Sequence, residues 1–370
     1  MAITKIEVPE LFDFGSDNSA FKLPTGTTAE RPTSPSNGEM RFNTTTGYVE
    51  YYDTTDTQWW EIDYAIDPLT VDYLIVAGGG SSGAAGGGGG GGGGLRTSYG
   101  SVTGGGGVAE SALNLTAGTS YTWNVGAGGA GVVHANIGND GSQSTFSSIT
   151  STGGGGGGAY PPEGRSGGSG GGCGQSGQRS GGGSGAGGSA SSPTQGYPGG
   201  SKPTTATVNY VSAGGGGAGA AGGDVPSDVT PGAGGVGLAV NILNSTNATT
   251  ASVGEVSGGN VYYAGGGGGS NESSSPGAAG GLGGGTNGAA GCPGTAPLAG
   301  VANTGGGNGG TGGCGSAYST GGGSGVIILR YPSVYTATVT GTQASGSPFT
   351  EGTNKVSVFT AGTGTVTFSL

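Results

Sequence analysis

Charged residues are scarce in this sequence. Only 8% of the 370 residues are Asp, Glu, Lys or Arg, whereas the chain contains 15 Tyr, 8 Phe and 3 Trp. Disordered chains usually combine high charge density with few aromatic residues, so this composition favours an ordered protein. The 10 Lys and Arg residues are scattered and the formal net charge is -11, which excludes a basic stripe that could follow a nucleic-acid backbone.

Histidine and cysteine are nearly absent. His134 is the single histidine, so a metal site with a pair of histidines cannot be built, and we interpret His134 as a loop residue beside a turn. Cys173, Cys292 and Cys314 lie far apart, without the paired spacing of a zinc site or the even number of a disulfide framework. We expect no catalytic residue, no metal and no cofactor, and we interpret the cysteines as small apolar side chains.

Long apolar runs are missing as well. No stretch reaches the roughly 18 apolar residues of a transmembrane helix, so we expect no membrane insertion. The first residues, MAITKIEVPELFDF, contain charges and lack the apolar core of a secretory signal peptide. The sequence therefore predicts synthesis in a cytoplasm without an export signal.

Glycine is what the sequence does contain: 98 residues, with uninterrupted tracts at 86–94, 104–107, 153–158, 214–217 and 265–269. Such tracts bury no side chain and lose much backbone entropy on ordering, so only main-chain hydrogen bonds can hold them. An extended left-handed helix with three residues per turn has no internal hydrogen bonds, and its donors and acceptors point outward. Several of these polyglycine II helices side by side would form a lattice, in which nine residues span about 28 Å.

Apolar, β-prone segments border the glycine-rich region. Residues 71–77 run directly into glycine, and residues 325–331 close the region. Segments 109–115 and 121–125 alternate as half-buried strands do, and 146–149 is a further candidate strand. We predict an all-β fold class: a small N-terminal β collar, a β-sandwich scaffold that carries a bundle of polyglycine II helices, and C-terminal β strands.

Residues 21–62 have the pattern of short strands separated by turns. About 40 residues are too few to form a stable hydrophobic core by themselves. We therefore expect aromatic side chains of this unit to meet their counterparts on other copies of the chain. The candidates for this oligomer interface are Phe42, Tyr48, Tyr52, Trp59 and Trp60.

The same unit carries a resemblance to a known family. Residues 23–32, 37–47 and 50–53, followed by Trp59, resemble the collar repeat that is common in the tail fibres of bacteriophages. Collars of that family accompany trimeric fibres. The resemblance thus implies a homotrimer, attached through the N-terminus to a tail or baseplate protein of the virion.

The glycine-rich region carries a second resemblance. Residues 73–80, 121–131 and 324–332 are similar to the glycine-rich domains of phage fibres, and to the glycine-rich extracellular domain of some receptor tyrosine kinases. The resemblance implies a β-sandwich with inserted polyglycine II helices, whose connecting loops at one end meet the host receptor. The strand pair that usually precedes 71–77 is missing, while 354–368 resembles it. We expect the C-terminal strands to fold back and complete the sandwich, within the chain or by a swap onto a neighbour.

These observations predict a chain of four parts. They are a virion-anchoring segment (1–20), the collar (21–68), the glycine-rich domain (69–332) and the C-terminal strands (333–370). The expected function is that of a phage tail fibre that recognises a host receptor or glycan. It would be made in the host cytoplasm and be part of the virion, extracellular after release. The alternatives are a capsid decoration fibre and, less favoured, a surface polysaccharide depolymerase.

Interruptions between glycine tracts are the best candidates for receptor contacts, because binding residues gather on exposed loops of a rigid scaffold. These interruptions are 95–99, 160–165, 195–210, 224–231, 241–252 and 292–301. Aromatic and guanidinium side chains there could stack on sugars or grip a surface protein. The candidate contact residues are Arg96, Tyr99, Tyr160, Arg165, Tyr197 and Tyr210. The alternative is that the tyrosines cap the bundle or pack between subunits.

A hydrolase would need a pair of carboxylates. Asp224 with Asp228, and Glu255 with Glu272, are the possible pairs, but none lies on a firm strand pattern. Strings of the form GxGxxG are expected by chance among so many glycines, and the Walker form is absent. The sequence therefore favours a binding protein over an enzyme.

Overall fold

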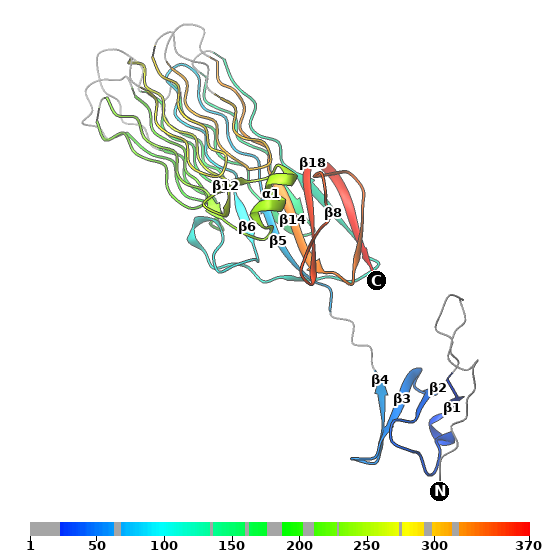
Figure 1. The fold of residues 1–370 in the computed structure, drawn as a ribbon. Coiled ribbons are helices and arrows are strands. Elements are labelled where there is room, and N and C mark those ends of the chain that lie inside the picture. Colours follow the sequence, from blue (N-terminus) through cyan, green and yellow to red (C-terminus); the bar gives the residue numbers. More distant parts are fainter. Residues whose placement is uncertain are drawn as a thin grey trace. The chain divides into compact units, whose positions relative to one another are not determined.

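The structure is a computed structural model that describes residues 23–62, 68–133, 136–159, 163–175, 187–202, 211–227, 229–273, 276–291, 298–312 and 318–370. The chain divides into two compact units, Met1–Asp67 and Pro68–Leu370. Both are built mainly from strands and extended chain (Figure 1). Among the described residues, no helix has the length and apolar character needed to cross a bilayer.

The first unit contains a four-stranded sheet with the order β1-β2-β3-β4. Its strands are β1 (Thr25–Gly26), β2 (Met40–Asn43), β3 (Tyr48–Asp53) and β4 (Gln58–Ile62), with the short helix η1 (Thr28–Glu30) after β1. β2, β3 and β4 form an antiparallel meander, whereas β1 pairs with β2 in parallel. Gly47 has a φ of 81°, which suits the tight turn between β2 and β3.

The second unit is built on an 11-stranded sheet. Its centre consists of β5 (Thr70–Val76), β14 (Val326–Pro332) and the long strand β18 (Asn354–Ser369). The remaining strands are β6 (Leu95–Thr97), β7 (Leu113–Asn114), β8 (Ser120–Val125), β9 (Ser144–Phe146), β10 (Ile149–Ser151), β15 (Thr336–Val339), β16 (Thr342–Gln343) and β17 (Phe349–Glu351). The all-β fold class is confirmed.

The C-terminal strand β18 completes this sheet within its own chain. Its first part pairs with β14, from Asn354 to Phe359, and its second part pairs with β8, from Gly362 to Thr367. Gly362 has a φ of 76°, a backbone conformation that side chains disfavour, at the point where β18 passes from one partner to the other. The expected return of the C-terminal strands is therefore observed in cis in this structure.

The central strands are buried on both faces. Ile75, Leu329 and Phe359 lie in one apolar cluster, together with Trp123 and other aromatic side chains of the sheet. Their sequence neighbours lie in a second cluster on the opposite face, which includes Leu74, Val76, Ile328 and Val358. Burial on both faces explains why 71–77 and 325–331 are nearly continuous apolar runs.

A helix and a small sheet cover the second face. The three-stranded sheet has the order β11-β13-β12, formed by β11 (Leu238–Ala239), β13 (Asn260–Tyr263) and β12 (Glu255–Ser257). The helix α1 (Ser245–Ala251) begins at Asn244, whose side chain accepts a hydrogen bond from the N–H of Asn247, and it buries Ala248 and Ala251. The expectation of an exposed loop at 241–252 was wrong, because this segment is part of the scaffold.

The glycine tracts form extended rods that lie side by side (Figure 1). The tract 86–94 is central, and its amides donate to three other rods in turn with a period of three residues. Gly88, Gly91 and Gly94 donate to Gly158, Gly155 and Thr152; Gly89 and Gly92 donate to Ala213 and Gly216; Gly90 and Gly93 donate to Asn308 and Gly305. The N···O distances are 2.8 to 3.1 Å. This is the bonding predicted for polyglycine II helices.

The carbonyls of the same tract accept from three further rods. Gly91 accepts from Gly80, Gly89 accepts from Gly172, and Gly90 accepts from Gly267. The tract is thus surrounded by rods from very different parts of the sequence. The tract 104–107 differs from the prediction: it contains the short helix η2 (Gly104–Gly106), with φ of 74° at Gly105.

Side chains are sterically excluded from the central rods. A Cβ atom at Gly90 would lie 2.1 Å from the carbonyl oxygen of Gly80, and one at Gly91 would lie 2.3 Å from that of Ser169. Real Cβ atoms essentially never approach a main-chain oxygen so closely. The close spacing that permits the hydrogen bonds therefore requires glycine.

The substitution Gly91→Ala tests this requirement. We expect it to lower the free energy of unfolding by about 3 kcal/mol or more, because the obstructing atom belongs to a hydrogen-bonded main chain that cannot move alone. Gly321→Ala is the matched control, since the nearest atom to its Cβ lies 3.0 Å away and the next 3.9 Å away. Thermal unfolding followed by circular dichroism measures both variants. Equal melting temperatures for the two would contradict the steric account.

Candidate functional site

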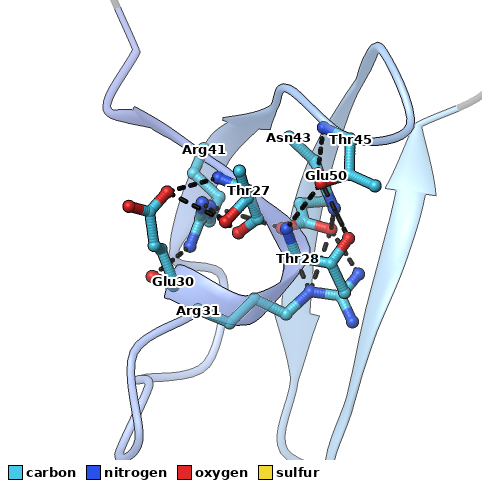
Figure 2. Close-up of polar contacts among 8 residues, drawn as sticks. All are labelled: Thr27, Thr28, Glu30, Arg31, Arg41, Asn43, Thr45 and Glu50. Carbon is cyan, nitrogen blue, oxygen red and sulfur yellow. Dashed lines mark hydrogen bonds and ion pairs between the residues drawn. The ribbon is translucent and has the colours of Figure 1, made fainter.

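The collar buries a charged cluster under η1. The side chain of Glu50 is fully buried, and its carboxylate accepts hydrogen bonds from Nε and Nη2 of Arg31 and from Nδ2 of Asn43 (Figure 2). Nε of Arg41 lies 3.3 Å from the same carboxylate. Burial pushes the pKa of Glu50 upward, but the hydrogen bonds from Arg31 and Asn43 and the positive charges of Arg31 and Arg41 outweigh this, so the pKa is lowered.

Arg41 also fastens η1 to the sheet. Its Nη1 donates to the carbonyl oxygen of Glu30 at 2.7 Å, and its Nη2 donates to that of Thr27 at 3.0 Å (Figure 2). The Glu30 carboxylate accepts from the N–H of Thr27 at 2.7 Å, and this bond lowers the pKa of Glu30. One face of the small sheet is therefore covered by polar contacts instead of an apolar core.

The other face of this sheet is apolar and exposed. Met40 pairs with Tyr51 and Tyr51 with Trp60, so these three side chains form a row across the strands. Phe42, Val49 and Ile62 form the next row on the same face. Met40, Tyr51, Trp60 and Ile62 are 42%, 36%, 46% and 41% exposed. We call these six residues the apolar collar face; the usual arrangement of polar outside and apolar inside is reversed here.

The structure divides the five predicted interface residues between the two faces. Phe42 and Trp60 belong to the apolar collar face. Tyr52 and Trp59 lie on the opposite face, with ring centroids 5.5 Å apart and the Arg41 guanidinium 6.0 Å from the Trp59 ring. Tyr48 is on that opposite face too, since it pairs with buried Asn43, but it is 44% exposed. Sequence reasoning missed Met40, Val49, Tyr51 and Ile62, which the alternation along β2, β3 and β4 could have indicated.

The rods of the second unit end together at the side away from the sheet. Gly86 donates to the carbonyl oxygen of Thr311 and accepts from the N–H of Gln175, and Ala84 donates to Asn136. Val133 and Tyr318 form an isolated antiparallel bridge there, and they are 54% and 53% exposed. We call this end of the bundle the tip. It gathers residues from widely separated parts of the chain, and Tyr318 is an exposed aromatic residue that sequence reasoning missed.

Two of the predicted receptor contacts lie at the scaffold end, not at the tip. Arg96 is on β6, where it forms an ion pair with Glu110, and Tyr73 donates to the same carboxylate at 2.8 Å. The Glu110 hydrogen bond raises the pKa of Arg96. Tyr99 packs against the apolar cluster beneath α1, with the Arg330 guanidinium 5.7 Å from its ring. Both side chains have partners within the chain.

The other predicted contacts are distributed along the bundle. Arg165 is on its side, 48% exposed, with Nη1 3.6 Å from the carboxylate of Asp140. Tyr197 is half-buried, and its N–H donates to Gly217 within the lattice. Tyr160 and Tyr210 lie outside the described residues.

The candidate catalytic groups have structural contacts. Glu255 accepts hydrogen bonds from the N–H groups of Gly283 and Gly284 at 2.7 and 2.9 Å, and Asp224 accepts from the N–H of Ser201 at 2.7 Å. Asp228 and His134 lie outside the described residues. Within the described part of the chain, no three His, Cys, Asp or Glu side chains gather as metal ligands do.

Cys173 packs with Val211, Ala213 and Val225 as a small apolar side chain would, and burial raises the pKa of its thiol to about 12. A thiol with such a pKa remains protonated at neutral pH and is a poor nucleophile. Cys292 and Cys314 lie outside the described residues.

Comparison with known proteins gives one match. The model of a family described as a glycine-rich domain matches residues 54–332, the greater part of the chain. No curated protein and no solved structure matches the sequence.

The buried carboxylate of the collar makes a prediction about pH. Glu50→Gln should lower the stability of the collar by roughly 3 kcal/mol at neutral pH, because it removes the charge that balances the buried guanidinium of Arg41 and the partly exposed one of Arg31. Because the pKa of Glu50 in the folded collar lies below its ordinary value of 4.5, the ionised carboxylate stabilises the fold at pH values above 4.5. This stabilisation is lost as the pH falls from 4.5 through the pKa of the folded state. The difference between the parent and the variant should therefore shrink below pH 4.5.

Hydrogen exchange of peptides that cover residues 40–62 measures this stability without interference from the second unit. Glu61→Gln is the matched control, since Glu61 pairs with Glu50 across the strands but is exposed. A loss of protection in Glu50→Gln that is no larger than in the control would show that the buried charge does not hold the collar together.

Proposed function

The chain belongs to the glycine-rich domain family, and from this premise we propose that it is a fibre protein of a bacteriophage tail that recognises the host surface through the tip of its glycine-rich bundle. The observation that carries the proposal is the hydrogen-bonded lattice around 86–94. A lattice of main-chain bonds makes the bundle stiff, and a stiff support presents surface residues at little entropic cost.

The tip is the part of the bundle that fits this role. It joins segments from several places in the sequence, as binding sites on rigid scaffolds commonly do. Val133 and Tyr318 are each more than half exposed there. An aromatic ring with a polar hydroxyl suits contact with a sugar or a surface protein. The partner we propose is therefore a host receptor or glycan.

The collar supplies the oligomer in this proposal. Four of the six apolar side chains of this sheet face are exposed in a single chain, and the other two are partly exposed, which is unfavourable in water. In an oligomer, the apolar collar faces of several copies could cover one another. The collar resemblance implies that the oligomer is a homotrimer. Residues 1–20, which lie outside the described residues, would attach the trimer to a tail or baseplate protein of the virion.

A competition experiment tests host recognition. The purified chain should inhibit adsorption of the phage that encodes it, without releasing reducing ends from the envelope polysaccharide of the host. Tyr318→Ala should weaken the inhibition about tenfold or more if this residue is a binding hot spot. Tyr48→Ala, which removes an exposed tyrosine of the collar, should inhibit as the parent does. Release of reducing ends would instead favour the depolymerase, and a lack of inhibition by the folded parent would contradict the proposal.

Sedimentation equilibrium tests the role of the apolar collar face. The parent should have the mass of three chains, and Trp60→Glu should sediment as a single chain because it places a charge within the proposed interface. Tyr48→Glu is the matched control, with similar exposure on the opposite face of the sheet. If Trp60→Glu keeps the mass of the parent, the subunits associate through another surface.

A further inference from the structure

The outer rods of the bundle differ from the central ones in their pattern of side chains. Residues 219–224, 232–237 and 276–282 are three such rods. The first two are joined by the bond from Gly219 to Val236, and the last two by the bond from Gly234 to Ala279. We call their solvent side the outer face of the bundle.

Glycine in the middle rod is confined to the positions that face other rods. Gly232 and Gly235 donate to Ser212 and Gly215 of one rod, while Gly234 and Gly237 donate to Ala279 and Leu282 of another. A Cβ atom at Gly235 would lie 2.2 Å from the carbonyl oxygen of Ala220, and one at Gly234 would lie 2.1 Å from that of Gly266. The remaining positions are Ala233 and Val236, and both are exposed.

The same period of three recurs in the other two outer rods. Six residues that follow this period donate their N–H to no acceptor among the described residues: Ala221, Asp224, Ala233, Val236, Ala279 and Leu282. The amides of Ala220 and Gly277, which fall outside the period, have no acceptor among the described residues either. Each of the six residues on the period carries a side chain, whereas the amides of the central tract 86–94, which donate to neighbouring rods, all belong to glycine. At position 276, in register with Ala279, proline has no N–H at all.

An unpaired row of main-chain donors is a site where another chain can add, as it is at the edge of a β-sheet. Within this bundle, the tract 86–94 bonds to rods that run in either direction, since its amides donate in register to 213 and 216 and in reverse register to 158 and 155. The polarity of an incoming rod would therefore not prevent its addition. To form hydrogen bonds, an incoming rod would have to come as close as the rods within the bundle do. At that spacing, a Cβ atom on one rod would collide with a main-chain oxygen of the other.

We propose that the outward side chains of the outer face end the lattice and keep bundles of neighbouring copies from joining through main-chain hydrogen bonds. Val236 and the alanines beside it hold an incoming rod beyond hydrogen-bonding distance. The side chains need no particular chemistry for this purpose, which agrees with the mixture of alanine, valine, leucine and aspartate. The occupant that they exclude is the outer face of a second copy of this chain.

The triple variant Ala233→Gly/Val236→Gly/Ala279→Gly opens the groove between two outer rods. The matched control is Ala233→Ser/Val236→Ser/Ala279→Ser, which keeps a Cβ atom at each position. Sedimentation velocity over a range of concentrations compares both with the parent. We expect the glycine variant to form larger species whose fraction increases with concentration, and the serine variant to sediment as the parent does.

Hydrogen exchange identifies the surface that associates. In the larger species, the amides of residues 233, 236 and 279 should become protected, because they would donate to the second copy. Association without this protection, equal association of the serine variant, or sedimentation of the glycine variant like the parent would each overturn the proposal. Melting temperatures are measured alongside, and Val236→Gly alone serves if the triple variant does not fold; it should then show the same protection at residue 236.

Discussion

The hydrogen bond between neighbouring glycine main chains determines most of this structure. A central rod without side chains can be approached from all sides, and the N–H groups of 86–94 then find carbonyl oxygens on three neighbouring rods. Each such bond contributes little by itself, on the order of 1 kcal/mol. Many of them act together, because no rod has internal hydrogen bonds and each depends on its neighbours. The lattice therefore replaces the thick apolar core that this composition cannot supply.

The strands of the β scaffold fix the positions at which the rods begin. Extended glycine segments have no intrinsic preference for one register, so something must position their ends. β5, β6 and β10 lead directly into or out of rods, and apolar clusters on both faces of the central sheet fix these strands. Ser144 and Ser151 donate to the carbonyl oxygens of Val76 and Ile75, which joins the strand ends at the base of the bundle. The strands set the register that the glycines then extend.

Much of this fold could be predicted from the sequence, but its sites less so. Consecutive glycines can be ordered only by main-chain hydrogen bonds, so the glycine tracts predicted the lattice. The apolar runs at 71–77 and 325–331 predicted buried strands. Helix α1 was missed because three threonines give it low helix propensity, and only Ala248 and Ala251 mark its buried side. Arg96 and Tyr99 were predicted to lie in an exposed loop. Residues 95–97 instead form β6, and this strand was not predicted because its partner β5 lies about 20 residues earlier in the sequence. In the collar, aromatic identity could not reveal the face to which Trp59 or Trp60 points, whereas strand register does.

The collar and the glycine bundle are both held together by polar contacts in their interior. The collar and the rods of the bundle lack the apolar volume for a core, so each relies on directed polar contacts inside: a buried carboxylate beside guanidinium groups in the collar, and main-chain bonds among the rods. Directed contacts leave the outer surface free to vary. In the collar that surface is apolar, which favours association, and on the outer rods it carries side chains at every third residue. In this bundle the uninterrupted tract 86–94 is an interior rod, whereas the rod 232–237, with side chains at Ala233 and Val236, lies at the edge of the lattice.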